Sequence, residues 1–158
     1  MSSGNQRWCG ALALIIGGPI VAVGMAAPTA GADPGSEVEQ AVATARGASS
    51  CGALQHNATV EQAADIVNRS TASYLDHSSG NVPADDPKPT ALLRDLGIET
   101  DNAITLLGAG RNAPDAIKAL LLQGYKEIPD CSYADIGTSM RVEEETGFVL
   151  VTAILVGP

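Results

Sequence analysis

Outside the N-terminal segment, apolar residues are most concentrated near the C-terminus, where two segments have the composition of β-strands. They run roughly over residues 134–142 and 146–156, and an acidic turn, Glu143 to Glu145, separates them. The second segment holds the densest group of β-favouring residues, with Val149, Val151, Ile154, Leu155 and Val156. This pattern predicts a hairpin. Because a hairpin is not stable alone in water, other elements must cover its apolar face.

Four segments upstream have the spacing of amphipathic helices. Their apolar residues recur at intervals of three and four, and a capping residue or a proline precedes them. The segments are 36–46, 59–75, 89–96 and 114–123. In the second of them Val60, Ala64, Val67 and Thr71 form the apolar stripe, and Asn68 falls with the charged residues on the other face.

One more strand is expected at 102–107, and we interpret Gly108-Ala109-Gly110 after it as a tight turn. A lone Gly-x-Gly does not make a phosphate loop, since no third glycine and no basic cluster follow it. The order is therefore helices, strand, helix and hairpin. It predicts one α+β layered domain with helices on at least one face of a sheet.

The N-terminal 32 residues have the pattern of a secretory signal peptide. One charge, Arg7, precedes an apolar run, and Ala30-Gly31-Ala32 forms a small-x-small cleavage site. An uncleaved membrane anchor is the alternative, although Gly17, Gly18 and Pro19 interrupt the run. After cleavage we expect a short N-terminal helix and linker over 33–50, no membrane span, and a protein that is secreted or held at the cell envelope.

The composition is acidic, with 18 Asp and Glu residues against 9 Lys and Arg residues and a formal charge of −9. Cleavage would remove Arg7 and no acid, which leaves 8 basic residues and a charge of −10. Such a surface repels phosphate backbones and anionic headgroups. Nucleic acid is therefore an unfavourable partner.

Two cysteines, Cys51 and Cys131, lie outside the signal segment. An even number of cysteines in an exported chain predicts a disulfide. A link between residues 80 apart would stabilise the fold by roughly 4 kcal/mol in the loop-entropy model. The alternative, a thiolate metal site, needs further ligands nearby in the sequence, and neither cysteine has them.

Several motifs resemble the CAP superfamily of secreted proteins, in its bacterial SCP-like form. They include Leu-Asp-His at 75–77, Leu-x-x-Leu-Gly at 93–97, the Pro114-x-Ala116-Ile117 helix and Tyr133-x-x-Ile136-Gly137. The resemblance covers residues 51–158 as one CAP-like domain. It implies a three-layer α-β-α sandwich with a C-terminal antiparallel hairpin.

The family often carries two histidines and two glutamates that hold a divalent metal in a cleft. Here His77 matches the first histidine, but 107–110 holds no acid and the second histidine position falls near Gln123 to Tyr125. A single imidazole does not hold zinc without other ligands. We therefore expect no metal and no cofactor.

The resemblance implies a binding or interaction protein without catalysis, for a small apolar ligand such as a lipid or for a protein partner. The candidate cleft contains His77, Arg111 and Tyr125, near the end of the long helix and the 108–112 segment. The alternative is a hydrolase with His77 as general base, and a purely structural envelope component is a third hypothesis. His56 is expected to be exposed, with no partner close in sequence.

Overall fold

A computed structural model describes residues 33–76 and 87–158 of the 158-residue chain. The expected signal segment, the cleavage site and His77 lie outside these residues. The elements are α1 (Pro34–Arg46), β1 (Gln55–His56), α2 (Ala58–Leu75), α3 (Thr90–Asp95), β2 (Ala103–Gly110), α4 (Ala113–Gln123), β3 (Asp135–Val142) and β4 (Val149–Val156).

The strands form one mixed sheet in the order β1-β3-β4-β2. Strands β3 and β4 are an antiparallel hairpin, with Val142 opposite Val149 and Asp135 opposite Val156. Strand β2 pairs antiparallel with the other side of β4, and the short β1 runs parallel to β3. All eight residues of β4 are buried because β4 is central and covered on both faces. The predicted C-terminal hairpin is confirmed.

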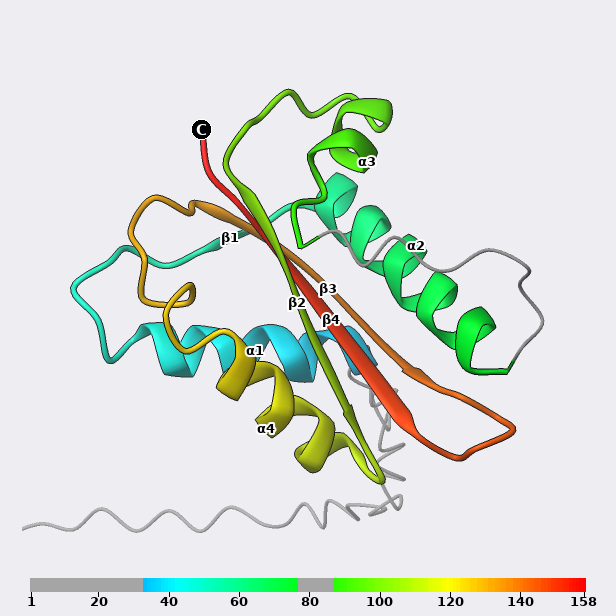
Figure 1. Cartoon of the computed structure of the whole chain (residues 1–158). Helices are drawn as coiled ribbons and strands as arrows, with labels where there is room; N and C mark the ends of the chain where they lie inside the picture. The colour runs from blue at the N-terminus through cyan, green and yellow to red at the C-terminus, as the bar shows by residue number, and fades with distance from the viewer. Residues whose placement is uncertain (1–32, 77–86) are drawn as a thin grey trace, which may run out of the picture. The chain divides into compact units, whose positions relative to one another are not determined.

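Helices cover both faces of the sheet (Figure 1), so the fold is an α+β sandwich of three layers. On one face α1 and α4 pack against Val151, Ala153 and Leu155 of β4. On the other face α2 and α3 pack against Ile154 and Val156. Successive residues of a strand point to opposite faces, so the continuous apolar run of β4 supplies both cores at once.

Helix α1 begins three residues earlier than the capping box at Ser36 suggests, and α2 begins two residues earlier than the capping box at Thr59 suggests. The carboxylate of Asp33 accepts a hydrogen bond from the backbone N–H of Gly35 at 3.1 Å. The side chain of Asn57 accepts from the N–H groups of Thr59 and Val60. Asp33 and Asn57 therefore satisfy N–H groups in the first turns of α1 and α2 that lack partners within the helix.

The tight turn expected at 108–110 is wrong, because these residues complete strand β2. The two glycines are needed because α4 packs against the strand backbone. A Cβ atom at Gly108 would lie 2.2 Å from the carbonyl oxygen of Ala116, and one at Gly110 would lie 2.5 Å from the Ala116 nitrogen. The glycine pattern therefore marks a close helix–strand contact rather than a reversal of the chain.

The predicted disulfide between Cys51 and Cys131 is formed. Beside it Arg46, only 3 % exposed, donates hydrogen bonds to four backbone carbonyls. The acceptors are Gly52, Ile128, Asp130 and Tyr133, in the two segments that carry the cysteines. Both segments are thus hydrogen-bonded to Arg46 at the C-terminal end of α1.

Across 33–76 and 87–158, no helix combines the length and the apolar composition that crossing a bilayer requires.

Candidate ligand-binding site

A cavity of about 310 Å³ lies between the C-terminal half of α2 and strands β2 and β4. Helix α2 contributes Asn68, Thr71 and Leu75 to its wall. The sheet contributes the apolar side chains of Leu107, Ala109 and Leu150, together with Thr152. This volume is at the lower end of the range for sites that bind small molecules.

The cavity exists because α2 packs over β3 and β4 rather than over the edge strand β2. Gly137 determines where α2 lies, since a Cβ atom there would be 2.1 Å from the Glu61 nitrogen. The helix therefore touches the backbone of β3 at its N-terminal end. Farther along, Leu107 and Ala109 on β2 face the same side of the sheet and line the cavity.

Asn68 is the main polar group of the cavity wall and is 1 % exposed. Its Nδ2 donates to Ser139 Oγ at 3.1 Å and to the Leu150 carbonyl at 3.2 Å. Because a carbonyl can only accept, the amide nitrogen must face Leu150, and this fixes the position of Oδ1. Oδ1 itself is buried and has no hydrogen-bond partner in the part of the chain that the structure describes.

Two threonine hydroxyls on the same face of the sheet are also buried, and neither has a partner among the described residues. Thr152, which is fully buried, lines the cavity, and Thr105 lies on the neighbouring strand β2. A buried polar group without a partner costs about 1–3 kcal/mol, so such groups are uncommon away from functional sites. Two residues of the cavity wall, Asn68 and Thr152, thus carry a buried acceptor and a buried hydroxyl within apolar surroundings.

Of the residues in the sequence-based cleft, Arg111 and Tyr125 lie at opposite ends of α4. The guanidinium of Arg111, just before α4, lies over the Phe148 ring at 5.1 Å from its centroid. Tyr125 is 64 % exposed and follows the other end of α4, so the length of the helix separates the two. His77 lies outside the described residues, and its role stays a prediction.

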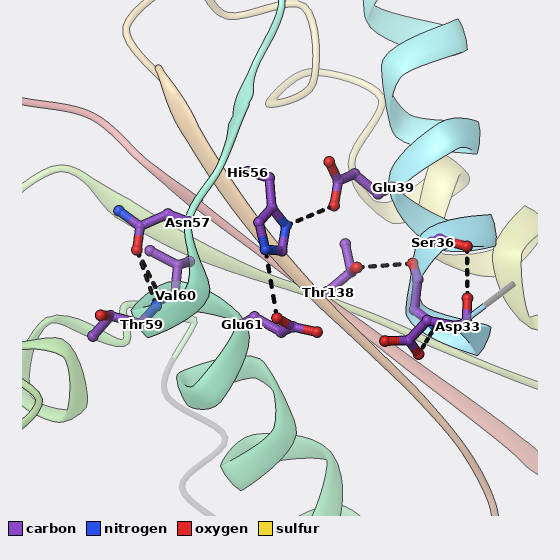
Figure 2. Close-up of polar contacts among 10 residues, drawn as sticks. Asp33, Ser36, Glu39, His56, Asn57, Thr59, Val60, Glu61 and Thr138 are labelled. Atoms are coloured by element: carbon purple, nitrogen blue, oxygen red, sulfur yellow. Dashed lines mark hydrogen bonds and ion pairs between the residues drawn. The ribbon is translucent and has the colours of Figure 1, made fainter. Parts of the chain in front are cut away.

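His56, expected to be exposed with no partner close in sequence, faces Glu39 of α1 and also Glu61, which is only five residues further along the chain (Figure 2). Its side chain is 48 % exposed, with Nδ1 3.0 Å from Glu39 Oε2 on α1 and Nε2 3.5 Å from Glu61 Oε2 on α2. In the same view Thr138 of β3 donates to the Gly35 carbonyl at 2.8 Å. These contacts join α1, β3 and α2. Within the described part of the chain, no three His, Cys, Asp or Glu residues are grouped so that they could hold a metal ion.

Sequence reasoning placed Asn68 on the polar face of its helix, and that interpretation is wrong. The signal was present: Val60, Ala64 and Asn68 are spaced by four, so they share one face of a helix. All three are buried. The sequence-based interpretation followed the polarity of Asn68 and not its spacing. In the structure Asn68 is buried, and its amide nitrogen donates to Ser139 and to the Leu150 carbonyl.

No protein-family model matches this chain, and no curated protein matches it. In fold it is similar to an outer surface protein from Borrelia burgdorferi, with a TM-score of 0.60 over 76 % of this chain and 89 % of that chain. The two sequences are 11 % identical over this region, so the likeness concerns the fold alone.

Proposed function

We propose that this chain is an exported, non-catalytic binding domain of the CAP type. Its ligand is small and largely apolar, carries one hydrogen-bond donor, and occupies the cavity between α2 and strands β2 and β4. The observation that carries the proposal is Asn68, a residue of the cavity wall whose buried acceptor Oδ1 has no partner within 33–76 and 87–158.

The chemistry of the lining supports this ligand class. Leu75, Leu107 and Leu150 offer apolar contact area, and burial of apolar ligand surface supplies most of the binding free energy. A donor on the ligand would satisfy Asn68 Oδ1, so a ligand without a donor binds more weakly. Catalysis is not part of the proposal, because the hydrolase alternative depends on His77.

Three observations support export. Residues 1–32 have the pattern of a signal peptide, the Cys51–Cys131 disulfide is typical of an oxidising compartment, and the similar Borrelia burgdorferi protein is named an outer surface protein. CAP-type membership is supported by the three-layer fold. It is also supported by the position of the cavity, between the end of the long helix and the 108–112 segment where the family resemblance implies a cleft.

The test uses aminoanthracene as a fluorescent probe, with anthracene as the same ring system without a donor. We expect aminoanthracene to bind about tenfold more tightly than anthracene, because only the amine can satisfy Asn68 Oδ1. The Ala109→Trp variant should fill the cavity from an exposed position of β2 and weaken probe binding about tenfold or more.

The matched control is Ala43→Trp, which adds the same side chain at an exposed position of α1 on the other face of the sheet. It should leave probe affinity unchanged. Equal affinity for the two probes, or binding that Ala109→Trp does not weaken, would contradict the proposed site.

A further inference from the structure

The end of α4 presents the most exposed large apolar side chains in the described part of the chain. Leu122 is 65 % exposed and Tyr125, in the turn directly after the helix, is 64 % exposed. Leu122 is in the last turn of α4, and Tyr125 follows three residues later, just beyond the helix end at Gly124. Two large apolar residues this exposed and this close in the chain differ from the scattered single residues found on most surfaces.

Two lysines flank this pair on a chain that is otherwise strongly acidic. Lys118 lies one turn before Leu122, and the Lys126 ammonium lies 5.5 Å from the Tyr125 ring centroid. Within 33–76 and 87–158, neither lysine has a carboxylate in ion-pair range, whereas Arg69, Arg94 and Arg141 each have one. Positive charge without a pairing acid is thus gathered at this place.

A hollow of about 310 Å³ adjoins Tyr125, between the C-terminal ends of α1 and α4. Ala45 and Ala48 of the α1 end and Leu121 of α4 contribute to its lining. These alanines contribute only small side chains to the lining. An apolar side chain from outside could insert here next to Tyr125.

We propose that Lys118, Leu122, Tyr125 and Lys126 form a docking surface for an acidic amphipathic helix of a partner protein. An apolar residue of that helix enters the hollow between α1 and α4, and its other apolar residues cover Leu122 and Tyr125. Acidic residues beside them pair with the two lysines. A helix laid along a groove with apolar anchors and a charged rim is a common mode of peptide recognition.

Charge decides between this partner and two others. A membrane with anionic lipids would attract the lysines but repel a chain of formal charge −9, so it is the less favourable surface. A second copy of the chain carries the same net charge, so two copies repel each other at long range. An acidic helix is also anionic, but it is small and can place its charges against the lysines alone.

The test measures binding of a fluorescent synthetic helix by anisotropy. The peptide, about 18 residues long so that it can form a helix, has leucine along one face and glutamate on both flanks. We expect binding to the purified mature protein that weakens as salt rises from about 0.1 to 0.5 M. The double variant Lys118→Glu with Lys126→Glu should weaken binding about tenfold or more, and a peptide with lysine in place of glutamate should then bind the variant better than the wild type.

The control variant, Arg69→Glu with Arg94→Glu, changes the net charge equally but on α2 and α3, across the sheet. It should leave peptide affinity within about twofold, because these distant charges are screened. Equal weakening in both double variants, or no binding of the acidic peptide at low salt, would overturn the proposal. The proposal would also be overturned if the protein did not bind the acidic peptide but used the two lysines to bind phosphatidylglycerol vesicles or to form a dimer. The docking surface lies on the α1–α4 face, so Ala109→Trp should leave peptide binding unchanged. The peptide experiment and the probe experiment therefore test the docking surface and the ligand cavity independently.

Discussion

Nη2 of Arg46 donates a 2.7 Å hydrogen bond to the carbonyl oxygen of Tyr133, which lies 87 residues further along the chain. The same guanidinium also reaches Gly52 and Ile128, at 2.7 Å in each case. One buried cation at the end of α1 thus holds the segments on either side of the Cys51–Cys131 disulfide. Its partners are carbonyl dipoles, so the fixed geometry of the guanidinium determines how both segments lie.

We expect Arg46→Met to lower the free energy of unfolding by about 3 kcal/mol or more, because buried carbonyls lose their donors. Guanidinium chloride unfolding of the oxidised protein measures this. The control Arg94→Met removes an exposed arginine whose surface ion pair with Glu99 is worth less than about 1 kcal/mol. A loss below about 1 kcal/mol for Arg46→Met would show that the four contacts contribute little.

Gly137 is the second residue on which the packing depends. A Cβ atom at this position would lie 2.1 Å from the Glu61 nitrogen and 2.2 Å from the Val60 carbonyl carbon, so α2 would have to move. We expect Gly137→Ala to destabilise the fold by about 3 kcal/mol, measured by chemical denaturation.

The matched control is Gly52→Ala, where a Cβ atom would meet nothing within 4 Å. Its effect should stay within about 0.5 kcal/mol. If the two variants were equally stable, α2 could not be packed directly on the backbone of β3.

Two buried threonines differ in whether their hydroxyl has a partner. Thr152, a residue of the cavity wall, has an Oγ1 without a partner in the described part of the chain, whereas Thr138 Oγ1 donates to the Gly35 carbonyl at 2.8 Å. We expect Thr152→Val to leave the free energy of unfolding unchanged or raise it by up to about 1 kcal/mol, since it removes an unsatisfied group. Thr138→Val should lower it by about 1–2 kcal/mol, since it leaves the Gly35 carbonyl unpaired. Thermal and urea unfolding of both variants give the comparison, and a destabilised Thr152→Val variant would mean that the hydroxyl is satisfied in the ligand-free protein.

The turn between β3 and β4 is closed by Glu143, whose carboxylate accepts from the Thr146 hydroxyl and from the backbone N–H groups of Glu145 and Thr146. These hydrogen bonds, that from the Thr146 side chain first, lower the pKa of Glu143 in the folded protein. A lowered folded pKa means that the stabilisation is present above the unfolded pKa of about 4.3 and is lost as pH falls through the folded value.

We therefore expect Glu143→Gln to be less stable than the wild type at pH 7, with the difference disappearing at acid pH where both states of Glu143 are protonated. Urea unfolding from about pH 7 to pH 2.5 tests this across the window in which Glu143 titrates. Glu144→Gln, an exposed neighbour in the same turn, serves as the control. A constant difference between wild type and Glu143→Gln at every pH would contradict the assignment.

Local patterns were sufficient for most elements. The hairpin strands were expected at 134–142 and 146–156 and occur at Asp135–Val142 and Val149–Val156. The short α3 was expected from Pro89 and Gly97, and Gly97 has the positive φ of 91° that favours glycine at a helix end. Strand β1 was missed because two residues carry no periodicity.

The sequence alone determined where the four helices and the three longer strands lie, that the last strands pair as a hairpin, and that two cysteines are available to join. These features depend on side-chain spacing and on capping groups close in the chain, so they can be read locally. Tertiary structure decided the rest. Whether Gly108 marks a turn or a helix contact, and whether Asn68 faces water or a cavity, depends on which distant backbone lies opposite. The fold can bury unpaired groups such as Asn68 Oδ1 because the burial of two apolar cores outweighs their cost.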